Sequence, residues 1–204
     1  MKLKAIDISV FLTLIICIIA TVSFEKDCKG IREEVLRLHV IANSDEAYDQ
    51  ELKLKVRDAV LRSGEAVFSG SEDILSAERE ITAEKDAILY SAVETVRSLG
   101  YDYDVKIELA RSYFPTRTYD NLTLPAGYYK AVRVIIGEGK GKNWWCIMFP
   151  PLCLPSATKK DELIGDFLTE RELNLVTSDP RYEVRFWLVE KYHELKNRLF
   201  VENQ

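Results

Sequence analysis

Hydrophobic and polar positions alternate along three short segments of the chain, which is the pattern of β-strands with one buried face. The first predicted strand covers residues 34–42, with leucine and valine on one face and Arg37 and His39 on the other. Two more strands are predicted over residues 104–110 and 128–136. The aromatic and apolar content of residues 143–149 predicts a fourth, buried strand.

A glycine-rich segment, Gly137-Glu138-Gly139-Lys140-Gly141, joins the last two of these strands. No helix and no Lys-Ser/Thr pair follows it, so a tight turn is favoured over a phosphate-binding loop. We therefore expect the third and fourth strands to form a hairpin.

Apolar residues recur every three or four positions in the longer segments, which is the pattern of amphipathic helices. It predicts helices over residues 46–68 and 72–99, the second ended by Gly100. A short helix is expected over residues 160–169, and a last one from Asp179-Pro180 to Phe200.

The order of the main elements, β-α-α-β-β-β-α, predicts an α/β (α+β) two-layer sandwich. In this fold a mostly antiparallel or mixed sheet of about four strands has its helices on one face. The other face carries the polar row of Arg37 and His39, for which we favour a solvated surface over a binding surface.

The first 24 residues differ from all the others. Lys2 and Lys4 precede a nearly unbroken apolar run over residues 8–22, which is typical of a signal peptide or a membrane anchor. Both remain open, although small residues at Thr21 and Ser23 favour cleavage. Positive flanks stay in the cytoplasm, so residues 31–204 are expected to form a single exported α/β domain.

The charge balance and the histidine and cysteine content indicate which partners, metal sites and disulfides can be expected. The 204 residues include 28 basic and 33 acidic side chains, a net charge of −5, which argues against nucleic acid as a partner. With two histidines and no clustered ligand spacing, we expect no metal site. Cys146 and Cys153 flank a Pro-Pro pair and predict a disulfide, with two reduced cysteines as the alternative.

A hydrolytic site would need Ser44 and Asp45 to meet His39. Along an extended strand His39 lies roughly 13 Å from Asn43, and no Gly-x-Ser-x-Gly elbow exposes the serine. Capping of the following helix is the favoured role of Ser44 and Asp45.

Three blocks of the sequence resemble stage II sporulation protein R of endospore-forming bacteria. They are residues 36–61 (LRLHVIANSDEAYDQELKLKVRDAVL), 118–141 (TYDNLTLPAGYYKAVRVIIGEGKG) and 143–153 (NWWCIMFPPLC). The resemblance implies a non-enzymatic signalling protein that needs no cofactor and is secreted into the space between the forespore and mother-cell membranes. Its implied partner is a membrane-embedded aspartic protease in the facing membrane, which cleaves the sigma-E precursor. The competing hypotheses are an exported hydrolase acting on cell-wall or peptide substrates and a passive envelope-binding module.

The resemblance transfers no catalytic residues. The candidates for contact with the partner are the polar and aromatic side chains of these blocks, since exposed aromatics are enriched where proteins bind each other. They are Arg37, His39, Asn43, Asp45, Arg57, Asp58, Asn143, Trp144 and Trp145.

Overall fold

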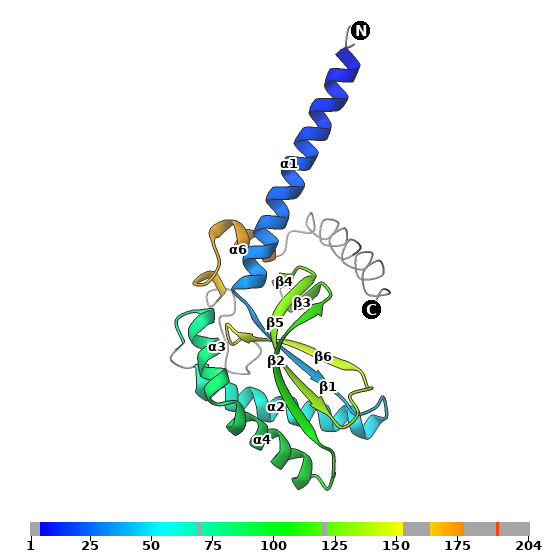
Figure 1. Cartoon of the computed structure of the whole chain (residues 1–204), viewed down its shortest axis with the longest axis vertical. Coiled ribbons are helices and arrows are strands. Elements are labelled where there is room, and N and C mark those ends of the chain that lie inside the picture. Colours follow the sequence, from blue (N-terminus) through cyan, green and yellow to red (C-terminus); the bar gives the residue numbers. More distant parts are fainter. Residues whose placement is uncertain (1–4, 69–70, 120–121, 153–163, 178–190, 192–204) are drawn as a thin grey trace.

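A four-stranded mixed sheet lies at the centre of the domain (Figure 1). The structure is a computed structural model that describes residues 5–68, 71–119, 122–152, 164–177 and 191. The sheet has the order β2-β5-β1-β6. Its strands are β1 (Leu36–Ile41), β2 (Val105–Phe114), β5 (Gly127–Ile136) and β6 (Asn143–Phe149). The four predicted strands and the mixed sheet are confirmed.

The predicted hairpin between β5 and β6 is wrong, because β1 lies between them. β1 runs parallel to β5 and antiparallel to β6. Five of its six residues are buried, so it gains most from a central position. The glycine-rich connection crosses the end of β1, where the amides of Lys140 and Gly141 donate hydrogen bonds to the carbonyls of Asn43 and Ala42 at 3.1 and 2.9 Å.

Three helices cover one face of the sheet: α2 (Ala47–Phe68), α3 (Ile74–Ala83) and α4 (Lys85–Ser98). The single helix predicted over residues 72–99 is divided at Glu84, whose φ of −96° and ψ of 9° are not helical. A straight helix of that length would extend about 40 Å, farther than a ten-residue strand. The bend keeps the apolar side chains of both halves, such as Ile81 and Ile88, in the same core.

A second apolar layer covers part of the opposite face, which was expected to be solvated. A small two-stranded sheet, β3 (Arg117–Tyr119) and β4 (Leu122–Leu124), lies in the predicted 111–127 loop. α6 (Glu170–Val176) begins at a capping box of Thr169 and Glu172. It starts after the helix predicted over residues 160–169, whose first four residues lie outside the described part of the chain. The last predicted helix, apart from Lys191, also lies outside the described residues.

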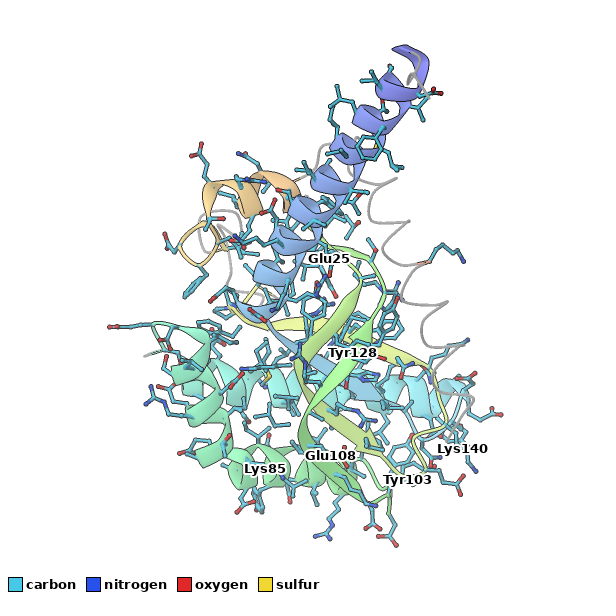
Figure 2. All side chains as sticks on the ribbon, turned by 45° about the horizontal axis from the view of Figure 1, so that its top comes forward. Glu25, Lys85, Tyr103, Glu108, Tyr128 and Lys140 are labelled. Carbon is cyan, nitrogen blue, oxygen red and sulfur yellow. The ribbon has the colours of Figure 1, made fainter. Side chains whose placement is uncertain are left out.

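α1 (Ala5–Glu33) runs without a break from the apolar N-terminal segment into this second layer (Figure 1). Its first two thirds are exposed and apolar, and Asp7–Glu33 is long and apolar enough to cross a membrane by length and composition. Its last turns are part of the core: Phe24 is 8% exposed, and Cys28 and Ile31 are fully buried. Figure 2 shows Glu25 at this junction, where its carboxylate pairs with the buried Arg32 at 2.5 Å. The packed domain therefore begins at Phe24.

Candidate functional site

Side chains of β1, β6, β2, β3 and β5 form a cluster on the sheet face opposite α2. We call it the Arg37 cluster. It consists of Arg37, His39, Phe114, Tyr119, Tyr129 and Trp145. The strand register places His39 beside Trp145 across the β1–β6 pair, with ring centroids 5.9 Å apart. Two of the predicted contact residues, His39 and Trp145, are therefore neighbours on this face.

Arg37 lies at the centre of the cluster and is fully buried. Its guanidinium carbon is 4.3 Å from the ring centroid of Phe114 and 4.9 Å from that of Tyr129. Its Nε donates a hydrogen bond to the Cys146 carbonyl at 3.0 Å, and Nη2 donates to the Tyr119 hydroxyl at 2.5 Å. The solvated role favoured for Arg37 is therefore wrong, because aromatic rings enclose its guanidinium.

No acidic side chain among the described residues pairs with this guanidinium. Burial lowers the pKa of Arg37, the hydroxyls of Tyr119 and Tyr129 oppose that shift, and the positive charge of Arg117 adds to it. A buried charge without a counter-ion costs several kcal/mol. The cation–π contacts offset about 2 kcal/mol of such a cost.

His39 occupies the rim of the cluster and is half-buried. Its Nε2 and the Asn143 Oδ1 are 2.8 Å apart, so a neutral ring that donates from Nε2 leaves the Nδ1 lone pair without a partner. Burial lowers the pKa of His39, the hydrogen bond with Asn143 opposes this, and the charge of Arg133 adds to it.

The lowered pKa of His39 predicts a loss of stability in mild acid. Between its depressed folded pKa and the unfolded value of about 6.5, the unfolded chain binds more protons, so stability falls as pH decreases through this window. We expect His39→Gln, which keeps a donor for Asn143, to flatten this dependence. Urea unfolding at pH 7.5 and 5.5 measures it, and an equal pH dependence in both proteins would contradict the prediction.

Other predicted contact residues lie on the opposite face of β6. The guanidinium carbon of Arg57, from α2, is 4.4 Å from the ring centroid of Trp144, and Arg57 also pairs with Asp58 at 2.6 Å. Trp144 is 36% exposed. The Trp144–Trp145 pair therefore divides between two faces, as strand alternation predicts, and Trp144 is the outward one.

Asn43 and Asp45 hold the glycine-rich connection in place. Asn43 Oδ1 accepts a hydrogen bond from the Glu138 amide at 3.0 Å, and Asp45 Oδ1 accepts one from the Lys142 amide at 2.7 Å. The Ser44 hydroxyl donates to Asp49 Oδ2 at 2.7 Å, whereas the hydrogen bond of His39 is to Asn143. Among the described residues, Ser44 therefore has no imidazole base. The predicted helix-start role is supported by the bond from the Glu46 amide to Ser44 Oγ at 3.2 Å.

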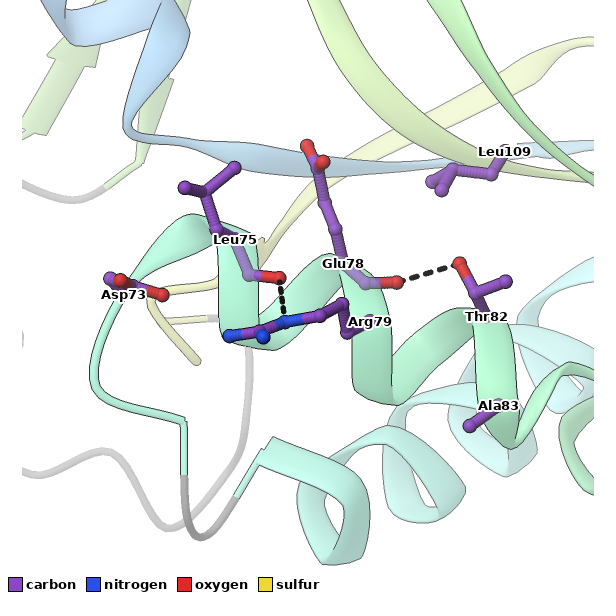
Figure 3. A pocket seen from close by; sticks show the side chains of 7 residues that line it. All are labelled: Asp73, Leu75, Glu78, Arg79, Thr82, Ala83 and Leu109. Carbon is purple, nitrogen blue, oxygen red and sulfur yellow. Dashed lines mark hydrogen bonds between the residues drawn. The ribbon is translucent and has the colours of Figure 1, made fainter.

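A hollow of about 700 Å³ lies between α3 and the edge strand β2 (Figure 3). Its polar side chains form hydrogen bonds within α3. Arg79 Nε donates to the Leu75 carbonyl at 3.3 Å, and Thr82 Oγ1 donates to the Glu78 carbonyl at 2.7 Å. The Glu78 carboxylate pairs with Lys130. Leu109 is 42% exposed at its wall. Because these groups already have partners, the hollow offers less chemistry than the Arg37 cluster.

The aromatic walls of the cluster were not predicted as site residues. Phe114 ends β2 in a segment expected to be a loop, while Tyr119 and Tyr129 lie inside the 118–141 block. The sequence of β1 did not indicate the burial of Arg37, because an arginine between Leu36 and Leu38 fits the alternation of a strand with one solvated face. Cys153 lies outside the described residues, so its disulfide with the buried Cys146 stays a prediction.

Comparison with known proteins supports the resemblance found in the sequence. No solved structure matches this chain. The family model of stage II sporulation protein R matches residues 32–159, which include the Arg37 cluster and Trp144. Stage II sporulation protein R of Bacillus subtilis (strain 168) is 32% identical over 185 residues, covering 81% of this chain and 83% of the relative. The chain therefore belongs to the stage II sporulation protein R family.

Proposed function

We propose that this protein is a secreted sporulation signal that activates a membrane-embedded aspartic protease in the facing membrane, and so promotes processing of the sigma-E precursor. Membership of the stage II sporulation protein R family carries this proposal. The apolar first part of α1 supports export, as a cleaved signal or a retained anchor, into the space between the forespore and mother-cell membranes.

Activation by contact is an allosteric mechanism. The signal protein shifts the protease toward its active arrangement only if it binds that arrangement more tightly than the inactive one. In this mechanism the protease cleaves the peptide bond, and the exported domain provides the surface that binds and activates the protease. Trp144 is the best candidate on that surface, because it is an exposed aromatic whose face is already ordered by Arg57.

Reconstitution of precursor processing tests the proposal. With protease and sigma-E precursor in one vesicle preparation, the full chain added on the extracytoplasmic side is expected to start cleavage. Trp144→Ala is expected to lower the rate about tenfold or more, as loss of a hot-spot aromatic does.

The matched control is Tyr90→Ala on α4, which removes an aromatic that is 70% exposed and is expected to leave the rate unchanged. Cleavage that proceeds equally without the chain would refute the proposed function. Equal effects of the two substitutions would place the contact away from Trp144.

A further inference from the structure

Polar atoms without hydrogen-bond partners gather in and next to the Arg37 cluster. Within the described residues, Arg37 Nη1, His39 Nδ1, Trp145 Nε1 and Thr116 Oγ1 are all buried and unpaired. Buried polar groups normally have partners, and each missing hydrogen bond costs about 1–3 kcal/mol. Such a group of unpaired polar atoms needs an explanation, and a bound ligand is one.

Three of these four atoms select an acceptor with negative charge, whereas the fourth, His39 Nδ1, becomes a donor only when the ring is protonated. Arg37 Nη1 and Trp145 Nε1 only donate hydrogen bonds, and the Thr116 hydroxyl can also donate. Arg117 adds a second positive charge, with its guanidinium carbon 4.4 Å above the Trp145 ring. A carboxylate fits this set, since it carries one charge and accepts from several donors, one of them a planar guanidinium.

Tyr119 separates Arg37 from solvent. It is partly exposed, whereas the guanidinium it contacts is fully buried. Its hydroxyl accepts from Arg37 and donates to the Trp145 carbonyl at 3.2 Å. Because Arg37 is fully buried, a ligand would reach it only after the Tyr119 side chain rotates. Exposed Arg117, two residues earlier on β3, would lie beside that opening.

We propose that the Arg37 cluster binds a carboxylate carried by an acidic side chain of the partner protein, which enters between Tyr119 and Arg117. A protein segment is favoured over a free acid because the rim at His39 continues into Asn143, at the exposed start of β6. This inference rests on the proposed function, since it specifies what the partner presents.

A binding measurement tests the site without the protease. The full chain in detergent micelles is titrated with N-acetyl-glutamate methylamide and with its neutral glutamine analogue, and both Trp fluorescence and the histidine ring NMR signals are followed. The glutamate probe is expected to bind saturably and to raise the pKa of His39, because it places a negative charge beside the ring. Equal binding of the glutamine analogue, or no binding of either probe, overturns the proposal.

Substitutions locate the site. Arg37→Gln is expected to weaken binding of the glutamate probe at least tenfold, whereas Arg97→Gln, at an exposed position on α4, leaves it unchanged. Should Arg37→Gln fail to fold, the exposed Arg117→Gln is expected to weaken binding severalfold without loss of structure. Unchanged affinity in Arg117→Gln and in any folded Arg37→Gln protein overturns the proposal.

The processing assay identifies the source of the carboxylate. Arg37→Gln, or Arg117→Gln in its place, is expected to slow protease activation in proportion to its loss of probe binding. Full activation by a variant that no longer binds the probe rules out the partner as the source. If the unsubstituted chain fails to activate the protease, the proposed function fails, while the probe titration still decides whether the carboxylate site exists.

Discussion

A chain that begins at Glu34 is expected to unfold, whereas one that begins at Phe24 keeps its structure. The first truncation removes Phe24, Cys28 and Ile31, which fill the second apolar layer. Full burial of a large apolar side chain contributes about 1.5–3 kcal/mol, so their removal costs about 5 kcal/mol. That is a large share of the 5–15 kcal/mol typical of a domain.

Circular dichroism during urea unfolding measures this difference. Deletion of residues 1–23 serves as the control, because it removes the exposed apolar part of α1 and none of the side chains that the structure describes as buried. Equal midpoints for the two truncated chains would show that the last turns of α1 are dispensable to the fold.

Gly141→Ala is expected to destabilise the protein by about 2–3 kcal/mol, as overpacking against an inflexible neighbour does. A Cβ at this position would lie 2.1 Å from the Ser44 carbonyl oxygen, which is backbone and has little room to move. The Gly141 amide also donates a hydrogen bond to the Ala42 carbonyl at 2.9 Å. A shift of the Gly141 backbone would break this bond, which helps to hold the glycine-rich connection over the end of β1. The melting temperature should fall by roughly 5–10 °C in a chain of this size.

Gly100→Ala is the matched control for that substitution. Gly100 has a φ of +83°, so alanine there is strained by about 1–2 kcal/mol, but no atom lies within 4 Å of the added Cβ. A decrease in melting temperature no larger than that of Gly100→Ala would contradict a backbone clash at Gly141.

The strands were predictable because each carries its own local pattern, while their order was not. Nothing in the alternation of residues 128–149 reveals that β1, nearly 90 residues earlier, inserts between β5 and β6. A hairpin of β5 and β6 was the simplest arrangement for two strands joined by a short glycine-rich connection. It is wrong because β1, which is buried on both faces, lies at the centre of the sheet between them. The bend at Glu84 was hidden for a similar reason, since apolar spacing continues across it.

The sequence identified several residues of the site, but it did not predict that they would be buried or which elements would cover them. Arg37, His39, Asn143 and Trp145 were identified, and the structure brings them onto one face. A polar residue in a strand normally indicates a solvated face, so the burial of Arg37 depended on covering elements that its own strand does not encode. Those elements are the end of α1, the β3–β4 hairpin and α6.

The unbroken α1 determines how far this protein can reach. With α1 retained as a membrane anchor, its last turns, which are embedded in the domain, leave no flexible linker, so the domain would be held at the membrane surface in a nearly fixed orientation. Under the proposed function, this anchored domain would meet its partner in the facing membrane only where the two bilayers approach to about the thickness of the folded domain. Under the same proposal, cleavage at or before Ser23 would leave the core intact and allow the domain to diffuse through the whole intermembrane space instead of acting only at short range.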